Sequence, residues 1–223
     1  MAYNYRKKMF SKVDIIKKIH TEINDIFNKS QPNDKFCNLV IMFRPGVIQY
    51  IKNQTREQCL MAVTRDGMAL ACIKDQTHEI CLEAVKQNGL ALFLVKDKTP
   101  EICLAAVKQD GQSLFDVPEN YRTYELCMEA VKQNGRAIVS VPDNIITNKL
   151  CMEAIKRDSE SIYYIDNPTE EMCLAAVKAR GFNLQYIENQ TREICLAAIA
   201  QDKDAIDFVK DLSLIDEDPV SFD

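Results

Sequence analysis

Short apolar clusters alternate with polar stretches along most of the chain, and the spacing within each cluster is helical. In the segment EICLEAVKQNG (residues 79–89), apolar residues lie at −1, 0, +1, +3 and +4 relative to Cys81. At about 100° per residue, these positions cover one broad face of an α-helix. A shorter cluster follows, with Ala91, Leu92 and Val95 at i, i+1 and i+4, which suits two helical turns better than a strand. The pattern therefore predicts a pair of short helices.

This pair of helices recurs as an internal repeat. Each copy contains one cysteine in register, and successive cysteines are 22, 22, 22, 24, 24, 22 and 22 residues apart. A threonine stands four residues before seven of these eight cysteines, and an alanine stands three residues after seven of them. Self-similarity at a fixed period is typical of a solenoid. The repeat cysteines are Cys37, Cys59, Cys81, Cys103, Cys127, Cys151, Cys173 and Cys195.

Polar residues and glycines indicate where the first helix of each repeat begins and ends. The threonine can accept hydrogen bonds from the free N–H groups of the first turn. A glutamate two residues later suits the positive end of the helix dipole. Glycines are placed to end the helix as C′ residues, a position where glycine commonly adopts a left-handed conformation. These glycines are Gly67, Gly89, Gly111, Gly135 and Gly181.

We therefore expect an all-α solenoid of about eight helix-turn-helix repeats of 22–24 residues, over residues 32–211. Residues 1–31 would form an N-terminal basic segment and a capping helix, and residues 212–223 an acidic C-terminal tail. One alternative is that segments such as LALFLVKD are strands, which would give an α/β horseshoe. The signature of leucine-rich repeats is missing, so the helical pair is favoured.

The segments EICLEAVKQNGLAL and EICLAAVKQDGQSL resemble the repeat known as domain of unknown function 4116, familiar from giant DNA viruses and some bacteria. The resemblance extends over residues 33–210. It implies an α-helical repeat protein that is viral and acts inside an infected host cell, and it implies no activity and no catalytic residues. Ser159 and Lys203 replace the glycine in two later repeats, and Arg180 replaces the Asn or Asp before it, so these helices can end differently.

Residues 11–28 predict a separate amphipathic helix before the repeats. Ser11 and Asp14 resemble a capping box, and isoleucines from Ile15 to Ile26 form one apolar stripe with Phe27. A solubilising cap over the end of the stack is the favoured interpretation. A helix that binds a partner or a second copy of the chain is the alternative.

Composition and charge limit the classes of partner. Apolar residues make up 47% of the chain and charged residues 27%, a balance typical of globular proteins. The net charge of −5 makes nucleic acid an unlikely partner. A lysine column five residues after the cysteines could follow phosphates, but lysine also complements the last helical turn. Neither a secretory signal nor a transmembrane segment is predicted, so we expect an intracellular, reducing compartment such as the cytoplasm, or the virion.

No residue pattern indicates catalysis or metal binding. His20 and His78 have no nucleophile and acid beside them, and phosphate-loop, dinucleotide and zinc-protease motifs are missing. Single cysteines 22 residues apart lack the spacing of zinc ligands. Stacked helices about 8–10 Å apart would also hold them beyond the disulfide limit of about 7 Å. We expect no enzyme activity, no metal and no cofactor, and we interpret the repeat cysteines as small buried hydrophobes.

Residues that do not repeat are the candidates for specificity. Position +13 after the cysteine varies most, and its residues in the last three repeats could form an aromatic strip or be part of the core. The two longer connections, residues 118–123 and 142–147, could be neutral insertions or binding loops. The candidate binding residues are Tyr50, Tyr121, Arg122, Tyr124, Ile145, Ile146, Tyr164, Tyr186 and Phe208.

From these features we expect a non-catalytic helical-repeat scaffold that mediates protein–protein interaction. Its partner would be a host or viral protein, with no membrane and no nucleic acid involved. The alternative is a structural or self-assembling virion protein that associates through its end caps.

Overall fold

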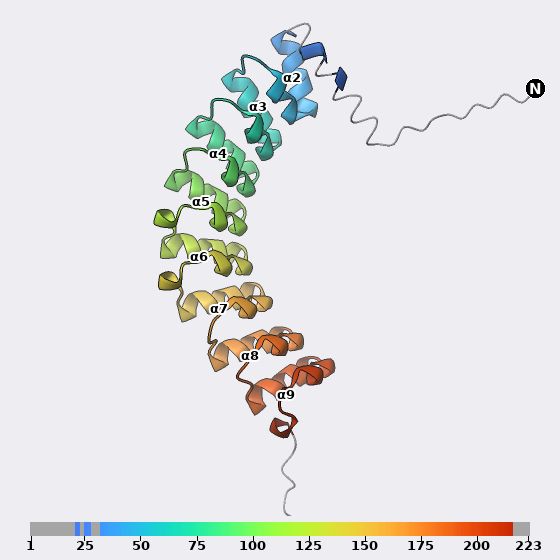
Figure 1. The fold of residues 1–223 in the computed structure, drawn as a ribbon, viewed down its shortest axis with the longest axis vertical. Helices are drawn as coiled ribbons and strands as arrows, with labels where there is room; N and C mark the ends of the chain where they lie inside the picture. The colour runs from blue at the N-terminus through green and yellow to red at the C-terminus, as the bar shows by residue number, and fades with distance from the viewer. Residues whose placement is uncertain (1–20, 23–24, 28–31, 216–223) are drawn as a thin grey trace, which may run out of the picture. The chain divides into compact units, whose positions relative to one another are not determined.

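A computed structural model describes residues 21–22, 25–27 and 32–215, and over these residues every regular element is a helix (Figure 1). Ten-residue α-helices alternate with six-residue 3-10 helices, so the chain is an all-α repeat solenoid. The alternative of strands in the second segment is wrong throughout the described ranges. Contacts between residues divide the chain into two compact units, residues 1–87 and residues 88–223.

The described part of residues 32–87 in the first unit contains three stacked α-helices. These are α2 (Asp34–Phe43), α3 (Arg56–Arg65) and α4 (His78–Gln87), and they alternate with η1 (Pro45–Tyr50) and η2 (Gly67–Cys72). α3 packs against both α2 and α4, and η1 packs against η2. Residues 21–22 and 25–27 are also helical. The rest of the predicted capping helix and the tail beyond residue 215 lie outside the described residues.

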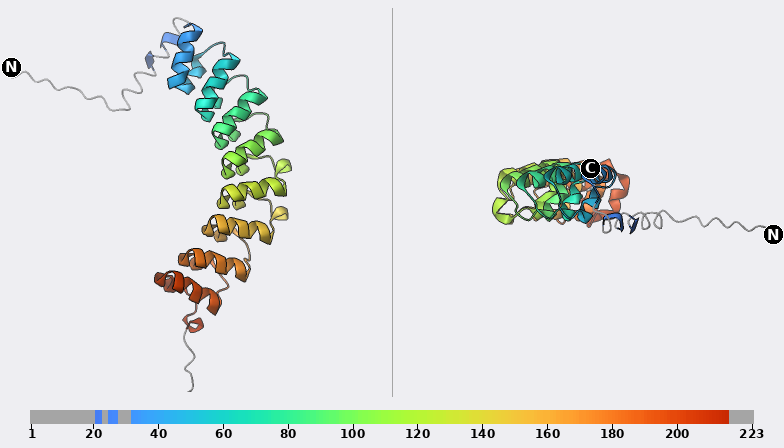
Figure 2. Two further views of the ribbon diagram at one scale, coloured as in Figure 1. Left: turned by 180° about the vertical axis from the view of Figure 1, so that it is seen from behind. Right: turned by 90° about the horizontal axis from the view of Figure 1, so that it is seen from above.

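The second unit continues the alternation in two layers (Figure 2). In one layer each α-helix contacts the next, and in the other each six-residue 3-10 helix contacts the next. The α-helices are α5 (Pro100–Gln109), α6 (Tyr124–Gln133), α7 (Asn148–Arg157), α8 (Glu170–Ala179) and α9 (Arg192–Gln201). The second layer contains η3 (Gly89–Leu94), η4 (Gly111–Asp116), η6 (Gly135–Ser140), η8 (Ser159–Tyr164), η9 (Gly181–Tyr186) and η10 (Lys203–Phe208). Three short turns, η5 (Glu119–Tyr121), η7 (Asp143–Ile145) and η11 (Leu212–Leu214), lie outside this pattern.

Side-chain caps explain why the chain turns at the two joints of each repeat. Thr99 begins α5, because its hydroxyl accepts a hydrogen bond from the Ile102 N–H at 3.3 Å. Asp110 both ends α5 and begins η4, because its carboxylate accepts from the Gln112 N–H at 2.9 Å. In one later repeat Arg180 takes the second position and makes no side-chain cap. The threonine cap of the α-helix was predicted from the sequence.

The second helix of each repeat, for which the sequence predicted two helical turns, is a 3-10 helix. Its bonds run from residue i to i+3, as from the Val117 N–H to the Leu114 carbonyl at 3.2 Å. A 3-10 helix has three residues per turn, so residues three apart lie on one side. Gly111, Leu114 and Val117 are therefore buried, while Gln112 and Phe115 face solvent. Six residues leave room for two such turns.

The glycines follow the α-helices at C′, as predicted, but none has a left-handed φ. Their role is to let successive repeats approach closely. A Cβ atom added to Gly135 would lie 2.5 Å from the carbonyl oxygen of Ala154 in the next repeat. Gly111 also donates its N–H to Oε1 of Gln133 at 2.6 Å, and Nε2 of Gln133 donates to the Gln109 carbonyl at 3.3 Å. Glycine thus permits the close approach, and at the joint between Gly111 and α6 a glutamine also bridges the two repeats.

Candidate functional site

The cysteine column lies inside the repeats. Eight of the nine cysteines are buried, Cys72 is half-buried, and all nine are free thiols. Burial raises the pKa of the thiols, for example those of Cys103 and Cys127, which disfavours the reactive thiolate. Among the residues that the structure describes, no group of three or more His, Cys, Asp or Glu side chains is placed to hold a metal ion. The column is part of the packing of the repeats.

Arg122, a predicted binding residue in the first longer connection, is engaged within the chain. Its guanidinium donates to the carbonyl oxygens of Val117 at 2.9 Å, Phe115 at 3.0 Å and Ser140 at 3.0 Å. The last of these acceptors belongs to the following repeat. Arg122 therefore ties two repeats together, and three of its five N–H donors are already in use.

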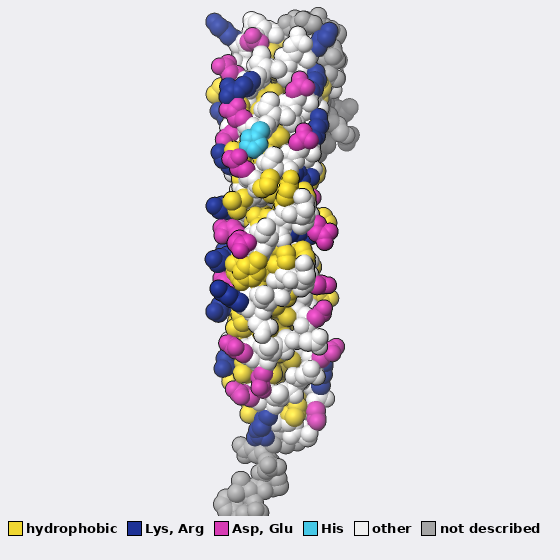
Figure 3. Space-filling model, turned by 90° about the vertical axis from the view of Figure 1, so that its left-hand side faces the viewer, with side chains coloured by type: hydrophobic (Ala, Val, Ile, Leu, Met, Phe, Trp, Pro, Cys, Tyr) yellow, Lys and Arg dark blue, Asp and Glu magenta, His cyan; other side chains and the backbone are white. Residues whose placement is uncertain are grey.

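The other candidates in or next to the two longer connections lie on one side of the second unit. Tyr121, Tyr124 and Ile145 are half-buried, whereas Ile146 is 38% exposed. On this side, hydrophobic side chains gather at the level of the repeats that carry the connections (Figure 3). Ile146 lines a cavity of about 350 Å³ that also contacts Tyr164. This part of the surface is hollowed between repeats.

Aromatic side chains from the predicted strip gather on η8, η9 and η10. Tyr163 joins Tyr164 and Tyr186, since its ring centroid lies 5.0 Å and 5.2 Å from theirs in edge-to-face contacts. Phe208 instead pairs with Phe182, with 5.5 Å between the centroids. The residues predicted as one aromatic strip thus lie in two separate groups, a tyrosine cluster of Tyr163, Tyr164 and Tyr186 and a phenylalanine pair of Phe182 and Phe208. The three tyrosines are 36–65% exposed.

The most exposed apolar column lies one position earlier, at +12, and sequence reasoning missed it. Phe93, Phe115, Val139 and Tyr163 occupy this position in four consecutive repeats and are 52%, 74%, 64% and 65% exposed. We call these four residues the apolar ridge. Because each of their 3-10 helices contacts the next, the ridge runs from η3 to η8. The sequence feature that could have revealed this column is the three-residue spacing of the glycine, leucine and valine positions that face the core. With this spacing, the residue after the leucine faces solvent.

Charged side chains border one end of the apolar ridge. Arg136 forms ion pairs with Asp158 at 2.8 Å and with Glu160 at 2.5 Å, both from the next repeat. Arg180, one repeat further along, also pairs with Glu160. A hollow of about 190 Å³ lies between Arg136, Glu160 and the tyrosine cluster. The ridge is thus apolar along its length, and charged side chains of both signs on η6, η8 and beside η9 lie next to its end.

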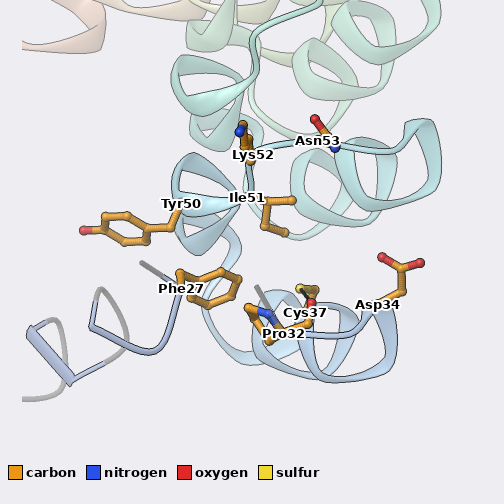
Figure 4. Close-up of a pocket in the computed structure, with 8 residues that line it drawn as sticks. All are labelled: Phe27, Pro32, Asp34, Cys37, Tyr50, Ile51, Lys52 and Asn53. Atoms are coloured by element: carbon orange, nitrogen blue, oxygen red, sulfur yellow. Dashed lines mark hydrogen bonds between the residues drawn. The ribbon is translucent and has the colours of Figure 1, made fainter. Parts of the chain in front are cut away.

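Tyr50, the remaining candidate, lies in the first unit beside a cavity of about 520 Å³ (Figure 4). Phe27 and Pro32 line the same cavity. The ring centroid of Phe27 is 6.4 Å from that of Tyr50 and 6.3 Å from that of Phe36. Phe27 is buried and Tyr50 is half-buried. Both rings therefore belong to the packing at this end of the first unit.

The stacked pairs of helices show that this is a helical-repeat protein. The model of the family described as domain of unknown function (DUF4116) matches residues 99–146 and 123–168. Residues 99–168 thus match this family, as the sequence motif of the repeats predicted. No curated protein and no solved structure matches the chain. Within the described ranges, no helix is both long enough and apolar enough to cross a membrane.

Proposed function

We propose that the protein is a non-catalytic helical-repeat scaffold that binds another protein through the apolar ridge. The observation that carries this proposal is the exposure of four apolar side chains at the same position of four consecutive repeats. Contiguous exposed apolar surface commonly marks an interaction site. Aromatic side chains, which supply three of the four ridge residues, are frequent anchors of protein interfaces.

The dimensions of the ridge favour a partner segment that lies along it. Three intervals of about 8–10 Å between repeats give a length of about 25–30 Å. That length matches about eight residues of extended chain or about 18 residues of α-helix. Because caps hold the ends of the 3-10 helices, the surface is preformed and loses little entropy on binding.

The proposal includes no catalytic role, no metal and no cofactor. The partner would be a host or viral protein. The viral setting and the action inside a host cell are what the family resemblance implies. The nine free thiols fit a reducing compartment such as the cytoplasm.

Affinity capture tests the proposal. Wild-type protein and a Phe115→Ser/Val139→Ser/Tyr163→Ser variant are used as baits in an extract of the cells that naturally make the protein, and captured proteins are quantified by mass spectrometry. We expect the specific partner to be depleted about tenfold or more with the variant, which corresponds to about 1.4 kcal/mol of binding free energy.

The matched control replaces three exposed lysines of the α-helical layer, Lys108, Lys132 and Lys178, by serine. This control should capture the partner as the wild type does. If the ridge variant keeps its circular dichroism spectrum and captures the same proteins in the same amounts, the proposal is wrong.

Self-association is a second candidate, and an exposed apolar face on α2 favours it. Phe36, Leu39, Met42 and Phe43 on this helix are 38–79% exposed. Such a face could pack against a second copy of the chain. Light scattering at increasing concentration would then show a rising mass that Phe43→Ser lowers. A constant mass equal to that of one chain would exclude this candidate.

A further inference from the structure

A glutamine side chain joins successive repeats at one recurring position, five residues before the cysteine. In the first unit, Nε2 of Gln54 donates to the carbonyl oxygens of Ile48 at 2.9 Å and Cys72 at 2.8 Å. Its Oε1 accepts from the N–H of Lys74 at 3.0 Å. The carboxamide thus uses both its donor and its acceptor on the backbone of two repeats.

Gln190 makes the same set of bonds in the second unit. Its Nε2 donates to the carbonyl oxygens of Phe208 at 3.0 Å and Leu184 at 3.3 Å, and its Oε1 accepts from the N–H of Lys210 at 2.9 Å. The acceptor carbonyl lies 18 residues after the glutamine and the donor N–H lies 20 residues after it, as for Gln54. The site for a carboxamide is therefore a recurring feature of the repeat.

Arg122 occupies this position in another repeat and makes a different set of hydrogen bonds. It donates to Val117 and to Ser140, the residue 18 positions later. Twenty positions later stands Pro142, which has no N–H to donate. A guanidinium has only donors, so it suits the site that lacks an N–H. Where the N–H is present, the matching group is a carboxamide with both a donor and an acceptor.

In the next repeat the position is occupied by Ile146, which cannot form these bonds. The corresponding backbone groups are the carbonyl of Tyr164 and the N–H of Asp166. Both residues line the cavity of about 350 Å³ together with Ile138 and Ile146. Among the residues that the structure describes, no group donates to this carbonyl or accepts from this N–H.

The following repeat has Pro168 at the position and an equivalent cavity of about 520 Å³. The carbonyl of Tyr186 and the N–H of Glu188 are the corresponding groups, and both residues line this cavity with Pro168. Over the described part of the chain, neither of these two groups has a hydrogen-bond partner. Two adjacent repeats thus present the same unfilled pattern of one acceptor and one donor.

Both cavities adjoin the apolar ridge. Val139 lines the cavity at Ile146, and Tyr163 lines the cavity at Pro168. A partner segment that lies along the ridge can therefore place side chains in both cavities. A carboxylate fits the cavity at Ile146 poorly, because it would meet the carbonyl oxygen of Tyr164 and the acidic side chains of Asp143 and Asp166. The cavity at Pro168 is lined by both Glu188 and Lys210, and a carboxylate there would have no N–H to donate to the carbonyl oxygen of Tyr186.

We propose that these two cavities bind primary carboxamide side chains, glutamine or asparagine, of a partner protein. Each carboxamide donates to the carbonyl of Tyr164 or Tyr186 and accepts from the N–H of Asp166 or Glu188, as Gln54 and Gln190 do within the chain. Adjacent repeats are about 8–10 Å apart, which is one turn of about three residues in a partner segment with the polyproline II conformation, and residues three apart in that conformation face the same side. The recognised pattern is thus Gln-x-x-Gln. This inference rests on the proposed binding function and names the chemistry of its partner.

A peptide titration followed by NMR tests the inference on the full chain. The probe is the N-acetyl, N-methylamide form of Gln-Ala-Ala-Gln, whose only primary carboxamides are the two side chains. We expect saturable downfield shifts of the backbone amide protons of Asp166 and Glu188. The matched peptide Met-Ala-Ala-Met has side chains of similar length without the hydrogen bonds, and it should bind about fivefold more weakly or worse.

The variants Ile146→Gln and Pro168→Gln place a carboxamide in each cavity from within the chain. The double variant should melt at a higher temperature than the control Ile146→Met/Pro168→Met, and it should no longer bind the glutamine peptide. If the peptide leaves the amides of Asp166 and Glu188 unmoved, or if the methionine or a glutamate peptide shifts them equally, the inference is wrong. In that case, if the Phe115→Ser/Val139→Ser/Tyr163→Ser variant still fails to capture the partner, the proposed function stands. Only the recognition of carboxamides is then wrong.

Discussion

Replacing Gly135 by alanine tests whether close approach between repeats sets the spacing of the stack. The added Cβ would lie 2.5 Å from the carbonyl oxygen of Ala154 and 3.0 Å from the backbone nitrogen of Asp158. Backbone atoms cannot rotate away, and carbon contacts are comfortable only near 3.5 Å. The α7 helix would therefore have to move away from η6 by about 1 Å. Overpacking of this kind costs about 1–3 kcal/mol of stability.

Urea denaturation followed by circular dichroism measures this effect. We expect Gly135→Ala to lower the midpoint by about 0.3–1.5 M, given an m-value of about 2–3 kcal/mol per molar for a chain of this size. The control is Gly46→Ala, because nothing lies within 4 Å of a Cβ added there. That variant should be neutral or more stable by about 0.4–1 kcal/mol. Equal midpoints for the two variants would refute the close-approach explanation.

The glutamine hydrogen bonds, the buried thiols and the half-buried thiol of Cys72 each give a further prediction. Gln133→Met leaves the N–H of Gly111 without its partner and should lower the free energy of unfolding by about 1–3 kcal/mol in the same assay; an unchanged midpoint would contradict this. Burial raises the pKa of thiols in the folded chain, while unfolded thiols ionise near about pH 8.5, so stability should be constant up to about pH 8 and fall as the pH rises further. The fall should be shallower for Cys103→Ala/Cys127→Ala, and an equal slope would rule out the thiols as its cause. Half-buried Cys72 should react with a water-soluble thiol reagent before the eight buried cysteines, so simultaneous labelling of all nine in the folded chain would argue against a closed core.

The first helix of each repeat is predictable because local pattern determines it. The threonine cap, the apolar face and the C′ glycine all lie within about a dozen residues of one another. The type of the second helix is harder to predict, because a six-residue apolar cluster fits periods of 3 and 3.6 almost equally well. The two periods differ only near the end of the cluster, where Phe115 turns outward and Val117 turns inward. Because the two periods differ only there, the outward-facing residues of the apolar ridge were not recognised from the sequence.

Features that depend on contacts between repeats could not be read from the sequence. Arg122 reaches Ser140, 18 residues away, so it looked like a free residue in a loop. The reason for glycine at 135 is likewise a contact with the next repeat. Ser159 stands at the same position one repeat later, and Ala179 replaces the glutamine of the following helix, so this joint has neither the glycine nor the glutamine.

Photo-crosslinking from the apolar ridge tests the central claim most directly. The photoreactive residue p-benzoylphenylalanine replaces Phe115, which is 74% exposed, or the exposed Lys108 as a control. After irradiation in the cells that naturally make the protein, the account predicts one discrete adduct to a partner protein from position 115 and none from position 108. No adduct from position 115, or the same adducts from both positions, would contradict a partner-binding ridge.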